Sequence, residues 1–263
     1  KTNSISNNVV SSIEEDRMGN VWIATEGGGL NYYNKITGAF RFYKHDPKDS
    51  TSLGSNLIKE AYLDKDDNLW LGTHGGSLNV LVSGASKFIR YPINTSNSHV
   101  AEISSITEDR NQRLWVASNS GLHIFKKSGI SLTALPSVKF SVRGIPKYLY
   151  RDNNNDIWIA ASPGLYLLQE DHLEELDSSC TINCFQEDDH GTLWMGTNRS
   201  GLLRFNKKSR QLLPDKHPFL QSLNILGIIS DSDGSLWLSS NKGLVHYFPN
   251  SKRYQLYTTA DGI

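Results

Sequence analysis

The sequence has few cysteines, no net charge and no long hydrophobic segment. Its 263 residues include two cysteines and balance 27 basic against 27 acidic side chains. A nucleic-acid-binding protein normally carries a basic excess or a basic stripe, so we expect no nucleic-acid contact. No apolar run approaches the roughly 18 residues of a membrane-spanning helix. Residues 1–4 lack the charged and apolar regions of a signal peptide, but a piece of a longer protein would look the same.

The two cysteines, Cys180 and Cys184, are four residues apart. In an extended strand their Cα atoms would lie about 13 Å apart, which is too far for a disulfide. We therefore expect two half-buried thiols, with a bridge across a turn as the alternative. No second Cys or His pair stands at the spacing of zinc ligands, and the sequence predicts neither a metal nor a cofactor.

What the sequence does contain is a sixfold repeat built around tryptophan. Each tryptophan has an aspartate six residues before it, apolar residues on both sides and a small residue two positions after it. Consecutive copies are 36 to 48 residues apart, which is the period of a propeller blade. The six pairs are Asp16 and Trp22, Asp64 and Trp70, Asp109 and Trp115, Asp152 and Trp158, Asp188 and Trp194, and Asp231 and Trp237.

Each copy predicts four antiparallel strands. An apolar run leads into a polar cluster and a second apolar run follows at once, as in residues 13–25, which is the signature of a hairpin. The segment around the tryptophan is apolar on both faces, as expected of a strand inside stacked sheets. The fourth strand alternates, as in residues 40–43, and no segment shows helical periodicity. Four antiparallel strands per repeat, radially arranged, predict an all-β fold, a β-propeller.

The predicted β-propeller domain or fragment covers residues 1–263. Its blades are expected at about residues 6–50, 51–98, 99–141, 142–178, 179–221 and 222–263. The chain carries nothing like the terminal cap that an open array needs. Either the six repeats close on themselves or they belong to a seven-bladed or longer array, and we favour the longer array.

The repeated residues are interpreted as scaffold. We expect the aspartate to cap the hairpin turn by accepting backbone N–H bonds, and the small residue to leave room for a large ring of the next blade. Residues 64–68 faintly resemble a calcium loop, but they lack its glycine and its distal bidentate glutamate. The tryptophans are expected to be blade core and not platforms for stacking sugars.

One copy shows a complete motif, FQEDDHGTLWMGTNRSGL, at residues 185–202. It resembles the two-component regulator propeller repeat, and the resemblance covers nearly the whole chain. The second copy departs from the pattern with Ser77 at the loop glycine. The fourth has Arg151 in place of the glutamate and Asp156 before Ile157.

The resemblance implies the periplasmic sensor region of a hybrid two-component system of Bacteroides-type bacteria. Such regions recognise oligosaccharides and control glycan-utilisation genes through a phosphorelay. The expected partners are therefore an oligosaccharide ligand, the remainder of the same sensor chain and a second copy in a full-length homodimer. The membrane would be reached only through the parent protein. Its kinase activity would lie outside this fragment, and so we expect no enzyme here.

The loops between the second and third strands are the predicted ligand site. They emerge on the same face as the connections between blades, and their residues vary from copy to copy, whereas the scaffold positions repeat. Variable loops on a rigid scaffold commonly carry recognition. Polar side chains there suit sugar hydroxyls, and the cations suit an acidic or sulfated sugar. The candidate residues are Glu26, His74, Asn119, Asn198, Arg199, Asn241 and Lys242, and the alternative is that they are ordinary solvated turn residues.

Two other function classes stay open. A propeller can serve only for dimerisation or protein docking, in which case its binding mouth would be flat or plugged. The repeats also resemble, in style, the streptogramin-lyase type of propeller, for which His74 would be the catalytic candidate. No Ser-His-Asp or paired-carboxylate arrangement is fixed by spacing, so the sequence predicts no catalytic residues.

Overall fold

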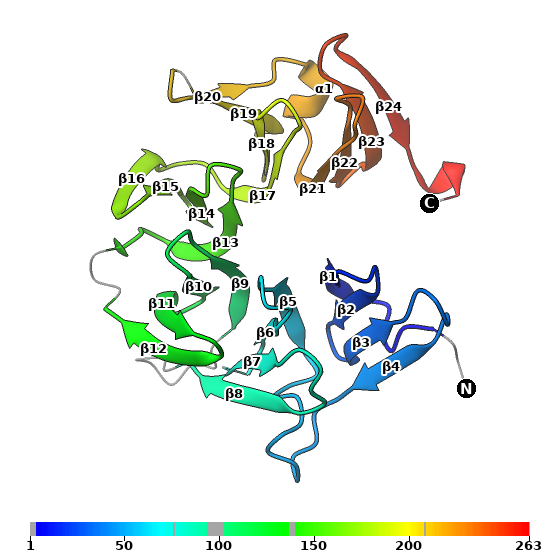
Figure 1. The fold of residues 1–263 in the computed structure, drawn as a ribbon. Helices are drawn as coiled ribbons and strands as arrows, with labels where there is room; N and C mark the ends of the chain where they lie inside the picture. The colour runs from blue at the N-terminus through cyan, green and yellow to red at the C-terminus, as the bar shows by residue number, and fades with distance from the viewer. Residues whose placement is uncertain (1–3, 76, 94–101, 137–139, 208, 263) are drawn as a thin grey trace. The chain divides into compact units, whose positions relative to one another are not determined.

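The computed structural model describes residues 4–75, 77–93, 102–136, 140–207 and 209–262. Twenty-four strands form six four-stranded antiparallel sheets, and within each sheet the strands follow chain order (Figure 1). This confirms the predicted all-β propeller class with four-stranded blades. The strands are β1 (Val10–Glu15), β2 (Val21–Thr25), β3 (Gly29–Tyr33) and β4 (Phe40–Tyr43); β5 (Ile58–Leu63), β6 (Leu69–Thr73), β7 (Ser77–Leu81) and β8 (Phe88–Pro92); β9 (Ile103–Glu108), β10 (Arg113–Ser118), β11 (Gly121–Ser128) and β12 (Ser131–Leu135); β13 (Ile145–Arg151), β14 (Ile157–Ser162), β15 (Leu165–Gln169) and β16 (His172–Asp177); β17 (Ile182–Glu187), β18 (Leu193–Thr197), β19 (Leu202–Asn206) and β20 (Gln211–Pro214); β21 (Ile225–Ser230), β22 (Leu236–Ser240), β23 (Gly243–Phe248) and β24 (Arg253–Tyr257).

Helical structure in the described ranges is limited to single turns. The helix α1 (Pro218–Gln221) connects β20 to β21, and the 3-10 turn η2 (Thr259–Asp261) follows β24. Proline at the first helical position is favourable because its missing N–H would be unpaired there anyway. A turn of four residues is too short to show a helical period in the sequence. None of the described helices is long and apolar enough to span a membrane.

The chain divides into two compact units, and each is described by itself below. The first unit comprises residues 1–141 and 145–149, and the second comprises residues 142–144 and 150–263. Each unit has its own apolar core. In the first, Leu30, Leu71 and Val116 are fully buried; in the second, Leu202 and Leu236 are.

The repeated aspartate caps the first hairpin turn of each of five blades. In the second blade, one carboxylate oxygen of Asp64 accepts the backbone N–H bonds of Asp66 and Asn68, both at 2.9 Å. Asp16, Asp109, Asp152 and Asp188 accept the same two bonds in their blades. This confirms the predicted turn cap. In the sixth blade the cap shifts, because the N–H of Ser235 donates to Asp233.

The third residue before each tryptophan has a left-handed backbone in all six turns. Asp67 and Gln112 adopt it with φ of 59° each, as Asn155 does with 63°, and glycines fill the other three positions. Glycine and asparagine tolerate this conformation best. The turn geometry therefore explains the preference for those residues that the sequence shows.

Four tryptophans make a second bond to the same aspartate. The indole Nε1–H of Trp70 donates to the other carboxylate oxygen of Asp64 at 2.9 Å. Trp115, Trp158 and Trp194 make the equivalent bond, and all four rings are buried, which confirms their core role. Trp22 and Trp237, in the first and last blades, are only partly buried.

In the two blades with glycine two residues after the tryptophan, that position faces an isoleucine and not a large ring. A Cβ on Gly72 would lie 2.5 Å from the side chain of Ile103, and one on Gly196 would lie 2.6 Å from Ile225. These isoleucines begin the first strand of the following blade. In these two blades the expectation of a ring was wrong, because a branched side chain is already wide enough to exclude a Cβ at this close approach.

Both cysteines are free thiols, as expected. Burial raises the pKa of Cys184 to about 12, and burial together with Asp177 raises that of Cys180 to about 12. Neither thiol is therefore a nucleophile at neutral pH, because the thiolate is the reactive form.

Candidate functional site

The candidate loops are held by a backbone bond that recurs from blade to blade. In the first blade the N–H of Glu26, at the end of β2, donates to the carbonyl of Val9, just before β1, at 2.9 Å. His74, Asn119, Asn198 and Asn241 donate in the same way to Leu57, Glu102, Thr181 and Asn224. In the fourth blade the equivalent residue, four after Trp158, is Ser162, and Pro163 follows it. The scaffold thus fixes the backbone at five equivalent positions while the side chain differs.

In the first unit, four charged or ionisable side chains form a chain of contacts. The ammonium of Lys59 lies 3.1 Å from Glu26 and 3.3 Å from Glu102. The other oxygen of Glu102 lies 3.6 Å from Nδ1 of His74. Bridges pair Glu26 with Leu57 and His74 with Glu102, so each loop contacts the segment that leads into the next blade.

Asn119 extends this arrangement. Its side-chain oxygen accepts the backbone N–H of Glu102 at 3.1 Å, and its own N–H donates to the carbonyl of Glu102 at 3.1 Å. The asparagine therefore fixes the backbone from which the Glu102 carboxylate projects. The structure brings together three of the predicted residues, Glu26, His74 and Asn119.

Sequence reasoning missed Lys59 and Glu102, which join those three residues. Both lie where the first strand of a blade begins. The connections between blades lead into these strands, and they were expected on the same face as the candidate loops. Considering the two kinds of loop together would have identified them.

The charged side chains of this chain of contacts are half exposed. The exposed fraction is 27% for Lys59 and 36% to 45% for Glu26, Glu102 and His74. Burial opposes the charge on Lys59, but hydrogen bonds to both glutamates outweigh it and raise the pKa of the ammonium. Exposed ion pairs are worth only about 0–1 kcal/mol each, so a ligand can replace them at little cost.

In the second unit, Asn198 and Arg199 point into solvent. Their side chains make no hydrogen bond or ion pair within the described part of the chain, and Arg199 has a left-handed backbone with φ of 84°. Non-glycine residues in this region are uncommon and often mark functional positions. The guanidinium is thus an exposed cation on a constrained turn.

Asn241 and Lys242 are more engaged. The side-chain oxygen of Asn241 accepts the backbone N–H of Asn224 at 2.9 Å, as Asn119 does for Glu102. The ammonium of Lys242 donates to Ser222 at 2.9 Å and lies 5.4 Å from the ring centroid of Phe219. Asn241 therefore has a scaffold role, and Lys242 combines a cation with an aromatic face.

These side chains suit recognition of a polar ligand. In the first unit, carboxylates accept hydrogen bonds and an ammonium donates them; in the second unit, the charged loop side chains are the guanidinium of Arg199 and the ammonium of Lys242. Over the described ranges, no group of three or more His, Cys, Asp or Glu side chains is arranged to hold a metal ion.

Comparison with known proteins identifies the repeat. Residues 4–27, 52–75 and 176–199 match the family model "Two component regulator propeller", which confirms the resemblance drawn from the sequence. Each matched segment ends in a candidate loop, and together they contain Glu26, His74, Asn198 and Arg199. A curated relative, histidine kinase P4 from Formosa agariphila, is 27% identical over 155 residues, which is 59% of this chain and 9% of that protein.

Solved structures share the fold. The extracellular domain of a hybrid two-component system from B. thetaiotaomicron is 24% identical with a TM-score of 0.81, covering 100% of this chain and 36% of that one. A virginiamycin B lyase from Staphylococcus aureus is 14% identical with a TM-score of 0.74, covering 96% of this chain and 85% of the lyase. At these identities the similarity establishes the propeller fold alone. The chain spans 9% of the curated kinase and 36% of the crystallised domain.

Proposed function

We propose, from the two-component regulator propeller repeats that this chain carries, that it is a ligand-sensing part of the extracytoplasmic region of a hybrid two-component sensor. It binds, or helps to position, an oligosaccharide signal and catalyses no reaction. The parent protein lies in the inner membrane with this region in the periplasm. Its kinase passes the signal through a phosphorelay that controls glycan-utilisation genes.

The observation that carries this proposal is that the same backbone hydrogen bond recurs at one loop position while the side chain at that position differs between blades. Five loop residues make the same N–H bond to the start of their blade; Asn119, Asn198 and Asn241 share a side chain there, whereas Glu26 and His74 carry ionisable groups. A purely structural position would be expected to repeat its side chain, as the turn aspartates do. Variation at a fixed position is typical of recognition.

The chain of contacts in the first unit matches the chemistry of sugar hydroxyls. A hydroxyl both donates and accepts a hydrogen bond, and here the Glu26 and Glu102 carboxylates accept while Lys59 donates. Each of these groups can exchange a half-exposed protein partner for a ligand oxygen. In the second unit, Arg199 presents two parallel N–H groups that suit a carboxylate or sulfate of an acidic sugar.

The test is a calorimetric screen of glycan fragments against the complete extracytoplasmic region. For a fragment that binds, Glu102→Ala or Arg199→Ala is expected to weaken binding at least tenfold, because each removes a charged contact worth about 1.4 kcal/mol or more. Lys48→Ala, an exposed lysine between β4 and β5, is the matched control and should bind as the unaltered protein does. A bound fragment that is indifferent to both Glu102→Ala and Arg199→Ala would place the site elsewhere.

A further inference from the structure

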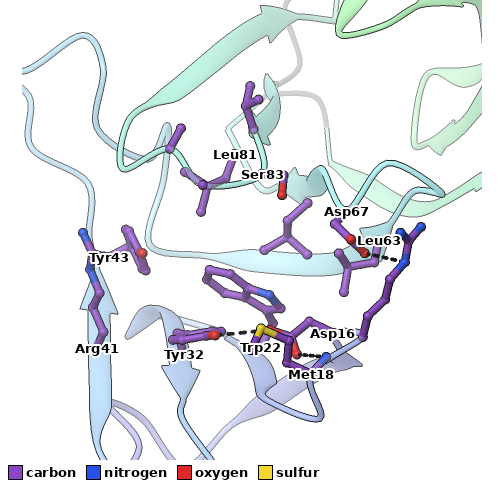
Figure 2. A pocket seen from close by; sticks show the side chains of 15 residues that line it. Asp16, Met18, Trp22, Tyr32, Arg41, Tyr43, Leu63, Asp67, Leu81 and Ser83 are labelled. Carbon is purple, nitrogen blue, oxygen red and sulfur yellow. Dashed lines mark hydrogen bonds and ion pairs between the residues drawn. The ribbon is translucent and has the colours of Figure 1, made fainter.

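A cavity lies between the first and second blades, at the other end of β2 from the candidate loops. Its volume is about 290 Å³. Figure 2 shows the Trp22 ring flanked by Tyr32 and Tyr43, with the Asp16 carboxylate beside the indole. The ring centroid of Trp22 lies 4.4 Å from that of Tyr32 and 5.8 Å from that of Tyr43. Three aromatic rings line the cavity, together with the carboxylates of Asp16 and Asp67 and the guanidinium groups of Arg17 and Arg41.

The strand register shows what occupies this place between other blades. Trp70 pairs with Val80, Trp115 with Ile124 and Trp194 with Arg204. The third residue after each of these partners is Ser83, Lys127 and Lys207, respectively. The residue before the turn aspartate of the same blades is Leu63, Glu108 and Glu187. The third and fifth blades thus carry a lysine and a glutamate where the second carries a serine and a leucine.

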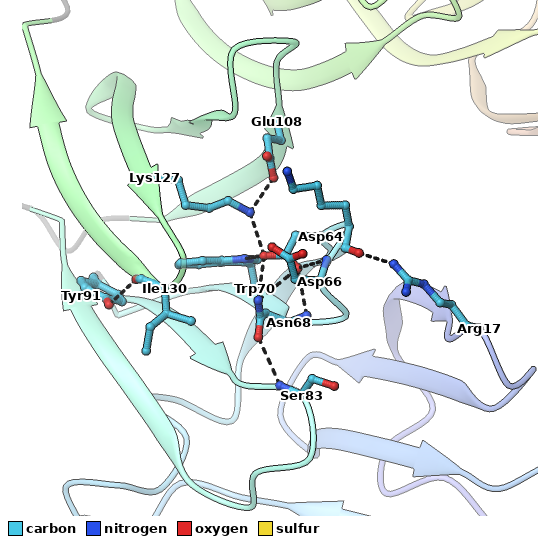
Figure 3. A network of polar contacts seen from close by, with 11 residues as sticks. Arg17, Asp64, Asp66, Asn68, Trp70, Ser83, Tyr91, Glu108, Lys127 and Ile130 are labelled. Atoms are coloured by element: carbon cyan, nitrogen blue, oxygen red, sulfur yellow. Dashed lines mark hydrogen bonds and ion pairs between the residues drawn. The ribbon is translucent and has the colours of Figure 1, made fainter.

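The ammonium of Lys127, in the third blade, binds the carboxylate of Asp64, the turn aspartate of the second blade (Figure 3). Its Nζ lies 2.8 Å from Asp64 and 2.7 Å from Glu108, and 6.0 Å from the ring centroid of Trp70. In the second unit, Lys207 repeats the arrangement, 2.7 Å from Glu187 and 3.5 Å from Asp152. At both places an ammonium therefore meets a turn aspartate.

Between the first and second blades no lysine of the described ranges takes that place. Leu63 and Ser83 both line the cavity, and neither carries a charge. Burial opposes ionisation of Asp16, but hydrogen bonds from Asn20, Met18 and Tyr32 outweigh it and lower the pKa of the carboxyl. Asp16 is therefore ionised at neutral pH, beside the place that an ammonium fills between the second and third blades and between the fourth and fifth blades.

Two further groups around the cavity form no hydrogen bond or ion pair with a described residue. The Trp22 Nε1–H has no hydrogen-bond acceptor within the described ranges, although four other indoles donate to their aspartate. The Arg41 guanidinium lies 4.9 Å from the ring centroid of Tyr43 and forms no ion pair with a described residue. Arg17 on the rim is already paired with Asp67 at 3.3 Å.

We infer that this cavity binds a primary ammonium group of a ligand, seated against Asp16 and the Trp22 ring where Lys127 and Lys207 place theirs. Aromatic rings attract a cation through their faces, and a carboxylate adds a charge-assisted hydrogen bond. The Trp22 Nε1–H and Arg41 are available to acceptor groups of the same ligand. An amino sugar and an aliphatic diamine share this chemistry. The site is independent of the proposed oligosaccharide site, because it uses other residues at the opposite end of the strands.

The test titrates the full chain with glucosamine, cadaverine and N-acetylglucosamine, and follows the ¹H–¹⁵N resonance of the Trp22 indole. That resonance is assigned with Trp22→Phe. We expect the two amines to shift it and N-acetylglucosamine, whose nitrogen is uncharged, to leave it in place. Tighter binding of glucosamine indicates an amino sugar, and tighter binding of cadaverine indicates an aliphatic amine. An equal shift with N-acetylglucosamine, or no shift with either amine, would overturn the inference.

Two variants isolate the ammonium position. Asp16→Asn keeps an acceptor for the turn N–H groups but removes the charge, and it should weaken amine binding at least tenfold. Ser83→Lys should abolish binding by supplying the ammonium internally, whereas the control Ser83→Ala should bind normally. Amine binding that survives Ser83→Lys at full strength contradicts the inference. None of these changes touches the candidate loops, so an oligosaccharide that binds there should be unaffected, and the two proposals can fail separately.

Discussion

Two carboxylate pairs in the first unit are in opposite electrostatic situations. Asp64 and Glu108 share the ammonium of Lys127, whose side chain is 2% exposed (Figure 3). Glu14 on β1 and Glu60 on β5 lie on neighbouring first strands, and neither forms an ion pair with a described residue. Both pairs are at least partly buried. They differ in whether a cation reaches them.

The acidities of Asp64, Glu14 and Glu60 follow from this difference. Burial opposes ionisation of Asp64, but hydrogen bonds from Lys127 and Trp70 outweigh it and lower the pKa. Burial raises the pKa of Glu14 to about 7, and burial together with the charge of Glu14 raises that of Glu60 to about 8. The shared ammonium therefore lowers a carboxyl pKa that burial alone would raise. Removing the ammonium should leave the buried carboxylates destabilised.

The largest effect is expected from Lys127→Ala. It leaves Asp64 and Glu108 buried without their cation, which typically costs about 3–5 kcal/mol. We expect the free energy of unfolding of the full chain, measured by urea denaturation, to fall by this amount. Lys126→Ala is the matched control, since Lys126 is the exposed neighbour on β11, and it should change stability by less than about 0.5 kcal/mol. Equal losses from the two variants would show that the buried cluster does not stabilise the unit.

Glu60→Gln tests the pair that has no cation. A carboxyl whose pKa is raised in the folded state contributes stability that is fully present below its unfolded pKa of about 4.5 and is lost as the pH rises through about 8. The glutamine cannot ionise, so the variant should be more stable than the unaltered protein at pH 9, by about 1–3 kcal/mol. At pH 4 the two proteins should differ little.

The measurement is the free energy of unfolding at pH 4, 6, 7.5 and 9. Glu15→Gln, which changes the exposed glutamate next to Glu14 on β1, is the control and should leave the pH profile unchanged. A Glu60→Gln profile parallel to that of the unaltered protein would mean that Glu60 is solvated in the folded state.

The fold could be predicted from sequence because its signal is local and repeated. The aspartate and tryptophan of each blade lie six residues apart across one hairpin turn, so the spacing itself records the turn cap and the indole bond. The strand order within each blade follows because the connections inside a blade are short. The sequence predicted a close contact at the small residue, Gly72. It did not identify Ile103 as the neighbour, because Ile103 comes from the next blade.

The charged clusters could not be predicted in the same way. Lys127 is 63 residues from Asp64, and the register that joins them depends on which blade each loop faces. The chain Glu26–Lys59–Glu102 likewise joins residues of three blades. Composition shows only that charges are balanced; the packing of blades decides which of them meet. Whether the loop residues bind ligand stays a prediction.

Lys207→Ala is expected to have the smallest effect. It compares a partly exposed lysine with the buried Lys127 at the same register position. Lys207 occupies the position of Lys127, but its side chain is 30% exposed. Glu187 also accepts the backbone N–H of Asn153 at 2.8 Å, and Asp152 accepts the Trp158 indole. Water and these donors can replace the lost ammonium, so we expect a loss of about 1 kcal/mol in urea denaturation. A loss as large as that of Lys127→Ala would mean that the number of carboxylates around the ammonium, and not its burial, determines the stabilisation.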